Sequence, residues 1–242
     1  MPPYAERWAL FLDIDGTLLD IADTPGAVAT GCRELALIDA LHQAADGALA
    51  LISGRTIGSI DRLFAPLRLP AAGQHGFERR GADGRRRRHR FPADRLRPVA
   101  AELREFAAEH PGVMVEDKGA SVALHYRLAP ELGAAARDAL AEAAAPLGAL
   151  VEIQAGKMVW ELKPAGADKG TAIAEFLSEP PFEGRVPVFL GDDVTDEQGF
   201  RVVAAAGGHA VKVGEGESAA RWRLPDPAAA RTWLRGWIDS GR

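Results

Sequence analysis

A short apolar run that ends in carboxylates limits the fold of this chain more than any other part of its sequence. Residues 9–14 read Ala-Leu-Phe-Leu-Asp-Ile, and the run continues into Asp15, Gly16, Thr17 and Leu18. An apolar run without polar alternation is typical of a strand buried on both faces of a parallel sheet. Because such a sheet needs helices on both of its faces, the run predicts an α/β fold.

Helix and strand patterns alternate on both sides of the middle of the chain. This alternation predicts a Rossmann-like, doubly wound parallel sheet. The segments after the first strand are expected to be a helix at 30–45, a strand at 48–52, a helix at 56–65, a helix at 168–177, a strand at 186–190, a helix at 195–205, a strand at 210–213 and a closing helix at 227–238.

The middle of the chain has a different rhythm. A hairpin is expected at 76–91, turning at Asp83-Gly84. The pattern helix, strand, strand, helix, strand, strand follows, and short turns make each strand pair antiparallel. We therefore predict a core formed by 1–78 and 164–242 with an inserted α+β cap domain, 79–163, of the order α-β-β-α-β-β. The two junctions are candidate hinges.

Composition excludes several classes of protein. The net charge of −5 lacks the excess of positive charge that is typical of nucleic-acid-binding proteins. The single cysteine, Cys32, excludes an internal disulfide and a cysteine-based zinc site. The N-terminus lacks the layout of a signal peptide, and no apolar run approaches the roughly 20 residues that span a bilayer. We expect a cytoplasmic, monomeric protein with neither a nucleic-acid nor a membrane partner.

A basic stretch, 81–90, is the local exception to the acidic balance. It contains four consecutive arginines, Arg85 to Arg88. Binding of an anionic polymer is one interpretation, but no aromatic residue interleaves the stretch before Phe91, so no stacking platform is indicated. A solvated hairpin that helps attract an anionic substrate is the favoured interpretation.

The first chemical motif is Asp13-Ile14-Asp15-Gly16-Thr17-Leu18. Two carboxylates two positions apart on a strand point to the same side. Gly16 allows a sharp turn that exposes backbone N–H groups, which hold phosphoryl oxygens well. A polar turn after a strand is the structural alternative. Because the motif directly follows a buried strand, the phosphoryl-binding interpretation is strongly favoured over that alternative.

Two further groups follow other predicted core strands. Ser53-Gly54-Arg55 offers a hydroxyl and a close approach to a phosphate, although Ser-Gly is also a common turn. The stretch from Gly191 to Glu197 places carboxylates at the end of an apolar strand, where hard oxygen ligands suit Mg²⁺. Asp193 can alternatively cap the next helix. Ligands in open α/β sheets bind at this carboxyl edge.

Lys169 precedes a predicted helix and completes the set. Its ammonium can neutralise Asp13 and an incoming phosphate, whereas an isolated lysine at a helix start is usually a solvated surface residue. Phosphoryl transfer depends above all on positioning and charge neutralisation. The predicted groups supply positioning and charge neutralisation: they are a nucleophilic carboxylate, a second carboxylate as acid and base, a divalent metal and a lysine.

These motifs resemble, in order, those of the haloacid dehalogenase superfamily of phosphatases. Over nearly its whole length the chain is similar to the trehalose-6-phosphate phosphatases. The DxDGT motif is specific only to the superfamily, whereas ALHYR, GK…ELKP and GDDVTDE together are fairly specific to that family. The matching stretches are LDIDGTL, LISGR, GQHGFERR, VEDKG, ALHYR, GKMVWELKP, DKG, PVFLGDDVTDE and AVKVG.

The resemblance implies a two-step, Mg²⁺-dependent hydrolysis of a sugar phosphate. Asp13 would attack phosphorus and become an aspartyl phosphate, and Asp15 would act as general acid and then as general base. The metal would be held by the Asp13 carboxylate, the Asp15 carbonyl and the Asp192 carboxylate. Asp193 and Asp196 would contact these ligands without binding the metal. The phosphoryl group would be bound by Gly16, Ser53, Gly54 and Lys169.

The resemblance also implies a set of substrate-binding residues. In the cap these are Glu116, Lys118, Arg127 and Glu161, with His125 and Lys157 as weaker candidates; on the core side they are Arg55, His75 and Gly76. Charged side chains hydrogen bond strongly to the hydroxyls of a disaccharide. Ion pairing across a solvated sheet face is the alternative that the residues alone would favour.

Three alternatives remain open at this point. The substrate can be another sugar phosphate, such as a sucrose or mannosyl phosphate, because only the cap distinguishes them. A phosphomutase would return the phosphoryl group to a sugar instead of to water. A silent sugar-phosphate sensor, or a regulatory module of a trehalose-synthesis complex, is a third possibility, but every expected catalytic residue is present.

Overall fold

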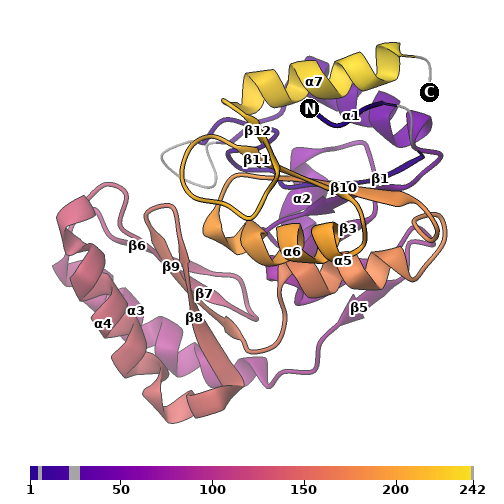
Figure 1. Ribbon diagram of the computed structural model, residues 1–242. Coiled ribbons are helices and arrows are strands. Elements are labelled where there is room, and N and C mark those ends of the chain that lie inside the picture. The colour runs from indigo at the N-terminus through magenta and orange to yellow at the C-terminus, as the bar shows by residue number, and fades with distance from the viewer. Residues whose placement is uncertain (5–6, 22–27, 241–242) are drawn as a thin grey trace. The chain divides into compact units, whose positions relative to one another are not determined.

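The computed structural model describes residues 1–4, 7–21 and 28–240 of the chain (Figure 1). The chain divides into two compact units. The first, which we call the core unit, comprises Met1–Arg88 and Asp168–Arg242; the second, the insert unit, comprises His89–Ala167. Within the described ranges, no helix combines the length and the apolar character needed to cross a bilayer.

The core unit is built on an eight-stranded sheet of the order β12-β11-β10-β1-β2-β3-β4-β5. The strands from β12 to β3 are parallel, and β4 and β5 are antiparallel to their neighbours. Their bounds are β1 Trp8–Leu12, β2 Leu49–Ile52, β3 Ala71–Gly73, β4 Glu78–Arg80, β5 Arg86–Arg88, β10 Val186–Gly191, β11 His209–Val213 and β12 Trp222–Leu224.

Helices cover both faces of the parallel part of this sheet, as the apolar runs predict. In Figure 1, α1 and α7 lie over one face, and α5 and α6 over the other. The helices of the core unit are α1 Cys32–Ala44, α2 Ile57–Leu63, α5 Lys169–Leu177, α6 Glu197–Ala205 and α7 Pro227–Asp239, with 3₁₀ turns at Gln74–Gly76 and Val194–Asp196.

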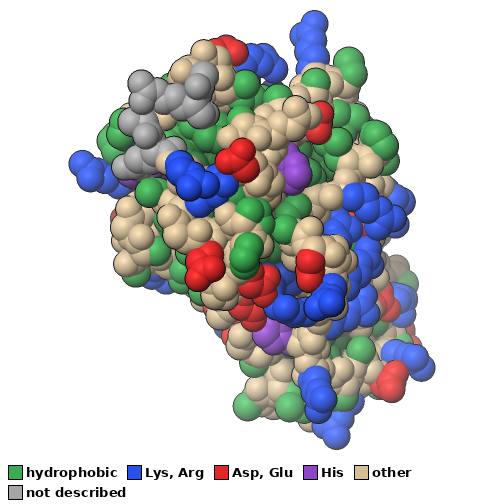
Figure 2. All heavy atoms as spheres, turned by 90° about the vertical axis from the view of Figure 1, so that its right-hand side faces the viewer, with side chains coloured by type: hydrophobic (Ala, Val, Ile, Leu, Met, Phe, Trp, Pro, Cys, Tyr) green, Lys and Arg blue, Asp and Glu red, His purple; other side chains and the backbone are tan. Residues whose placement is uncertain are grey.

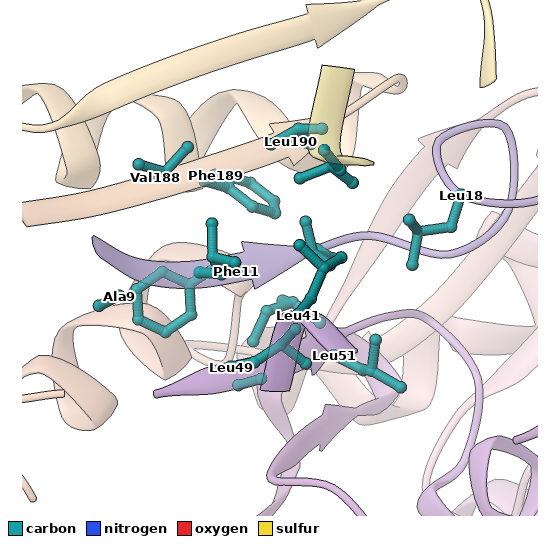
Figure 3. Close-up of a cluster of buried hydrophobic side chains, with 14 of the residues drawn as sticks. Ala9, Phe11, Leu18, Leu41, Leu49, Leu51, Val188, Phe189 and Leu190 are labelled. Carbon is teal, nitrogen blue, oxygen red and sulfur yellow. The ribbon is translucent and has the colours of Figure 1, made fainter. Parts of the chain in front are cut away.

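The core of this unit centres on β1, whose side chains are fully buried. Trp8 stacks on Trp237 of α7 with ring centroids 5.1 Å apart, and Phe11 stacks on Phe182 at 5.5 Å. Figure 3 shows side chains of β1, β2 and β10 packed together around Phe11. Burying a side chain of this size contributes about 1.5–3 kcal/mol, so this packing holds the strand ends in place.

The insert unit is a four-stranded antiparallel sheet of the order β6-β7-β9-β8 with two helices. Val122, Leu124 and Leu162 on one face pack with Leu103 and Leu140 of the helices. The element order is therefore the α-β-β-α-β-β that the sequence predicts. The bounds are α3 Leu96–Glu109, β6 Met114–Asp117, β7 Val122–His125, α4 Gly133–Ala144, β8 Val151–Gly156 and β9 Val159–Pro164, with 3₁₀ turns at Ala93–Arg95, Pro130–Leu132 and Ala145–Leu150.

The boundaries of the insert differ from those expected. The hairpin pattern predicts that residues 79–88 belong to the cap, but β4 pairs with β3, in the register Ala71↔Arg80, and β5 pairs with β4. The hairpin therefore extends the large sheet, and the insert begins at His89 and ends at Ala167. The sequence patterns also do not predict β3 and β12, because three residues are too few to show a period.

Candidate active site

Three strand ends meet at one edge of the core sheet. Asp13 follows β1, Ser53 follows β2 and Asp192 follows β10, and β1 lies between the other two strands. The backbone N–H of Asp13 donates to the carbonyl of Leu190 at 3.0 Å, which keeps the ends of β1 and β10 in register. The predicted carboxyl edge therefore exists and carries all three polar groups.

Lys169 joins two buried carboxylates at this edge. Its Nζ lies 2.8 Å from Asp13 Oδ1 and 2.7 Å from Asp196 Oδ1, and all three side chains are at most 6% exposed. Burial raises the pKa of Asp13, the nearby carboxylates of Asp196 and Asp192 raise it further, and Lys169 counteracts them. Burial alone would lower the pKa of Lys169, but Asp13 and Asp196 outweigh it and raise that pKa.

Asp192 is fixed by close contacts with the loop after β1. The hydroxyl of Thr17 lies 3.1 Å from Asp13 Oδ2 and 3.3 Å from Asp192 Oδ1, so it links the two carboxylates. Gly16, with φ of +84°, passes so close that a Cβ there would stand 2.1 Å from Asp192 Oδ2. Only glycine can occupy this position, because a side chain would both strain the turn and collide with the carboxylate.

The carboxylates of Asp13, Asp192 and Asp196 form a cluster suited to a cation. One oxygen from each lies within 4.8 Å of the others, and all three residues are buried. Buried carboxylates repel one another unless a positive charge lies between them, and hard oxygen ligands suit Mg²⁺. These residues therefore fit a divalent metal.

Asp196 also holds the backbone of the loop after β10. Its Oδ2 accepts the backbone N–H groups of Asp192 and Asp193, at 3.0 and 2.9 Å, while its Oδ1 holds Lys169. Asp193 accepts the N–H of Val194 at 2.8 Å and caps the 3₁₀ turn there. The capping interpretation of Asp193 is thus correct, and no metal-binding contact is needed to explain it.

Asp15 and Arg55 form a bidentate ion pair, at 2.6 Å and 2.7 Å. The Asp15 side chain is 35% exposed and that of Arg55 12%. Ser53 Oγ accepts the backbone N–H of Arg55 at 3.1 Å, which shapes the loop after β2. Arg55, predicted as a substrate ligand, therefore binds the proposed acid–base residue of the chain itself.

His75 and the two neighbouring glycines belong to the same edge. A Cβ on Gly54 would lie 2.6 Å from His75 Nε2, so the imidazole rests directly on the phosphate-binding loop candidate. Gly76 has φ of +101°, and a Cβ there would lie 2.4 Å from the carbonyl of Asp168, the residue before Lys169. Both glycines permit close approaches between neighbouring loops that a side chain would block.

The predicted substrate residues of the insert unit lie on the strands of its sheet or in the turns that follow them. In the register of the sheet, Glu116 lies beside Ala123, and Ala123 beside Glu161. Glu161 accepts Lys118 Nζ at 2.8 Å and the hydroxyl of Ser121 at 2.6 Å. This row lies on the face opposite Val122 and Leu162, which pack under the helices.

The other insert residues form pairs of their own. His125 Nε2 lies 3.0 Å from Glu116 Oε2, and Arg127 donates to the carbonyl of Lys157 at 3.0 Å. Burial would raise the pKa of Glu116, but the hydrogen bond from His125 and the charge of Lys118 lower it on balance. The face is thus polar and internally paired, which agrees with cross-strand ion pairing and leaves substrate contact as a prediction.

The basic stretch forms the outer edge of the core sheet. Arg86 and Arg88 of β5 form ion pairs with Asp61 and Glu78, each at 3.0 Å. Figure 2 shows Lys and Arg side chains gathered on the face of the molecule that carries β5. Charged side chains on an edge strand prevent its pairing with another chain. The solvated-hairpin interpretation is therefore favoured.

Two polar residues at the site lie in the matching stretches but are given no role of their own by the sequence motifs. Thr17 lies inside the first motif, but its role as a link between two carboxylates depends on Asp192, far along the chain. Lys212 donates to the carbonyl of Asp192 at 2.7 Å and is only 5% exposed. Its signal in the sequence is a lysine inside the otherwise apolar run Ala-Val-Lys-Val.

Fold and site together define the class of this protein. The core is doubly wound and brings an aspartate, a lysine and a second acidic strand end to one edge of its sheet, and the chain also carries an α+β insert. This is the arrangement of haloacid dehalogenase-type phosphatases. Residues 11–228 match the family model described as Trehalose-phosphatase, and the chain belongs to this family of phosphoric monoester hydrolases.

Curated relatives agree with this assignment. The chain is 49% identical to a probable trehalose-phosphate phosphatase of Sinorhizobium fredii, over 86% of this chain and 78% of that protein. It is 43% identical to the trehalose-6-phosphate phosphatase of Escherichia coli, over 96% and 87% of the two chains. Both identities extend over the core and the insert, so the family assignment covers both units.

Solved structures agree in fold. A crystal structure of a trehalose-6-phosphate phosphatase related protein has a TM-score of 0.79 at 30% identity, covering 96% of this chain and 97% of that one. The C-terminal domain of the Candida albicans trehalose-6-phosphate phosphatase has a TM-score of 0.86 at 20% identity, covering 97% and 93%. At the lower identity the likeness concerns the fold alone.

Proposed function

We propose that this protein hydrolyses trehalose 6-phosphate to trehalose and phosphate, with Mg²⁺, through a phosphorylated Asp13. The observation that carries the proposal is the meeting of Asp13, Lys169 and Asp192 at one buried edge of the sheet. Residues that are far apart in the chain supply a nucleophile, a cation and a metal ligand there. Such groups have no structural need to lie together, but phosphoryl transfer requires all of them.

In the first step, one carboxylate oxygen of Asp13 attacks phosphorus as the bond from phosphorus to the sugar oxygen breaks. Asp15, protonated after its ion pair with Arg55 opens, gives its proton to that oxygen, and the sugar leaves as an alcohol. In the second step, a water attacks phosphorus, Asp15 takes a proton from that water, and the bond to Asp13 breaks. Phosphate is released, and both aspartates return to their starting states.

Lys169 and the loop amides have supporting parts. The ammonium of Lys169, held between Asp13 and Asp196, would offset negative charge on the phosphoryl group. Gly16, Ser53 and Gly54 would donate to its oxygens. The metal, held by the carboxylates of Asp13 and Asp192 and by the Asp15 carbonyl, would supply charge neutralisation at the phosphoryl oxygens.

The substrate assignment rests on the relatives and on the insert unit. The Escherichia coli relative, 43% identical, is a trehalose-6-phosphate phosphatase. We propose that residues 89–167 form the specificity cap and that its polar face reads the sugar hydroxyls. Glu116, Lys118 and Glu161 would be its main contacts, and His125, Arg127, Lys157 and, on the core side, His75 and Gly76 would assist them.

The remaining predictions accompany this proposal. The enzyme is expected to be a monomer in the cytoplasm that acts on a free sugar phosphate, without a nucleic-acid or membrane partner. A sucrose or mannosyl phosphate remains the alternative substrate, because specificity depends on the cap and not on the core chemistry. A phosphomutase or a silent sensor would share the core motifs but would not release phosphate.

A substrate panel tests the proposal. The purified protein is given trehalose 6-phosphate, sucrose 6-phosphate, mannosyl phosphate and glucose 6-phosphate at equal concentrations with Mg²⁺, and phosphate release is measured. We expect the highest kcat/KM for trehalose 6-phosphate, with trehalose and phosphate formed in equal amounts. A higher kcat/KM for another sugar phosphate would overturn the substrate, and sugar rearrangement without phosphate release would indicate a mutase.

A further inference from the structure

Lys212 is a buried lysine beside the acidic cluster. It lies on β11, directly opposite Gly191 of β10 in the sheet register. Its side chain reaches past the end of β10, and its Nζ donates to the backbone carbonyl of Asp192 at 2.7 Å. The residue is 5% exposed, so its ammonium is almost completely removed from water.

This burial has an energetic cost that the local contacts do not offset. Removing an ammonium from water costs several kcal/mol unless a carboxylate compensates it. Within the described ranges, the carbonyl of Asp192 is the one hydrogen-bond partner of Lys212, and no carboxylate forms an ion pair with it. An apolar side chain of similar length would fill the same space at lower cost. A contribution to stability therefore does not explain a lysine here.

The backbone around Asp192 is held from two sides. On one side, Asp196 Oδ2 accepts the N–H groups of Asp192 and Asp193. On the other side, Lys212 holds the carbonyl of Asp192. Together they fix both peptide planes that flank the Cα of Asp192, and hence the direction in which its carboxylate leaves the backbone.

We propose that Lys212 is a positioning residue, which fixes the Asp192 peptide so that the Asp192 carboxylate faces Asp13 and the divalent cation. This inference rests on the proposed function, since it assigns Asp192 as a metal ligand. Partners that orient metal ligands typically change metal affinity or activity by about 10- to 100-fold when they are removed. The hydrogen bond, rather than the charge, is the property that performs this role.

The positioning role and a purely electrostatic role predict opposite results. If Lys212 acted mainly through its charge, its removal would take a positive charge away from the cation site and would tighten Mg²⁺ binding. If Lys212 positions Asp192, its removal releases the ligand and weakens Mg²⁺ binding. The sign of the change in affinity therefore distinguishes the two roles.

The test compares Lys212→Met and Lys212→Arg with the wild-type protein. Mg²⁺ binding to metal-free protein is measured by isothermal titration calorimetry, and unfolding temperatures are measured in parallel. We expect Lys212→Met to bind Mg²⁺ at least about tenfold more weakly. Lys212→Arg retains a donor and should recover most of the affinity. The KM for sugar phosphate at saturating Mg²⁺ should change less than the affinity for Mg²⁺.

A matched control comes from the insert unit. Lys163 is also buried, at 2% exposure, and donates to the carbonyl of Ala167 at 2.5 Å, but it has a carboxylate partner in Glu152. Lys163→Met should lower the unfolding temperature without changing Mg²⁺ affinity. It therefore measures the general effect of removing a buried ammonium.

The outcomes separate this inference from the proposed function. If the wild-type protein binds no Mg²⁺ and releases no phosphate, the proposed function is wrong. If the wild-type protein does both, and Lys212→Met binds Mg²⁺ as tightly as wild type or more tightly, only the positioning role is wrong. Equal weakening in Lys163→Met, or no recovery in a stably folded Lys212→Arg, would also overturn it.

Discussion

Arg55 binds Asp15 through two parallel hydrogen bonds, from Nε to Oδ2 at 2.7 Å and from Nη2 to Oδ1 at 2.6 Å. A bidentate pair of this kind fixes the plane of the carboxylate as well as its position. Asp15 nevertheless remains 35% exposed, so it is accessible from the solvent side. We expect that Arg55 orients the Asp15 carboxylate for its base role in the second step, and the sugar contact that the resemblance implies for Arg55 stays a prediction.

Replacement of Arg55 should reduce turnover more than substrate binding. In Arg55→Ala the carboxylate of Asp15 loses its orientation, and misplacement of a reacting group by about 1 Å can cost on the order of 100-fold in rate. Arg55→Lys keeps the charge but not the fork, so its kcat should be intermediate. Steady-state kcat and KM are the measurements.

The opposite kinetic pattern would contradict this role. If Arg55 contacts the sugar, KM rises and kcat changes little. Arg68→Ala is a suitable control, because Arg68 belongs to the same unit, is 72% exposed and lies 3.5 Å from its partner Asp61. Its kinetic constants should equal those of the wild-type protein, since exposed pairs of this kind contribute little.

Asp13→Asn should abolish turnover while leaving the protein folded. Asparagine has the shape of aspartate but is not a nucleophile, so no acyl phosphate can form. Phosphate release measures the loss, and circular dichroism with thermal unfolding checks the fold. Acid-quenched protein after incubation with labelled substrate should carry phosphate in the wild type and none in the variant. Full activity of Asp13→Asn would exclude the covalent mechanism.

Removal of metal should silence the enzyme reversibly. Lys169 pairs with Asp13 and Asp196, but one ammonium does not balance the three carboxylates of Asp13, Asp192 and Asp196, so a divalent cation should bind there. After dialysis against EDTA, activity should be lost, and added Mg²⁺ should restore it. Because Mg²⁺ binds the folded state, it should also stabilise the protein, by about 2.7 kcal/mol at 100 times its Kd. Undiminished turnover in metal-free protein would contradict the metal assignment.

An ion-pair network on the core unit should make stability depend on pH. Glu179 accepts Arg79 through both oxygens, at 2.8 and 3.0 Å, and also pairs with Arg87. The hydrogen bonds from Arg79, against a smaller opposing effect of burial, lower the pKa of Glu179 from 4.5 to about 2. The folded protein therefore prefers the charged carboxylate more than the unfolded chain does.

The sign of the effect follows from this depressed pKa. The stabilisation is fully present above about pH 4.5 and is lost as the pH falls toward about 2. Glu179→Gln should lower the unfolding temperature at pH 7 by a few degrees, for a contribution on the order of 1 kcal/mol. The difference from wild type should disappear near pH 2. A difference that is independent of pH would show that the charge of Glu179 is not responsible.

Much of the candidate site could be predicted from local patterns. The apolar runs before Asp13, Ser53 and Asp192 indicate parallel strands, whose carboxyl ends lie at one edge of a sheet. The meeting of Asp13 and Asp192 with Lys169 is confirmed by the described geometry. Within the insert unit the order α-β-β-α-β-β is also confirmed, since each short turn allows only an antiparallel neighbour.

Contacts between distant residues could not be predicted in this way. Arg55 and Asp15 are 40 residues apart, and Lys212 and Asp192 are 20 apart, with no periodicity that relates them. The hairpin of β4 and β5 has the same local pattern in either unit, and its place depends on the open edge of β3. Strands of three residues, such as β3 and β12, carry too little pattern to be recognised.

The amino-acid sequence was sufficient to establish the α/β class, the motif residues and their common edge, because periodicity and turn chemistry act over a few neighbouring residues. The pairing of Arg55 with Asp15, the two-sided hold on Asp192 and the limits of the insert became known only from the folded chain. Each of these depends on the spacing between several strands, which packing of the whole core sets.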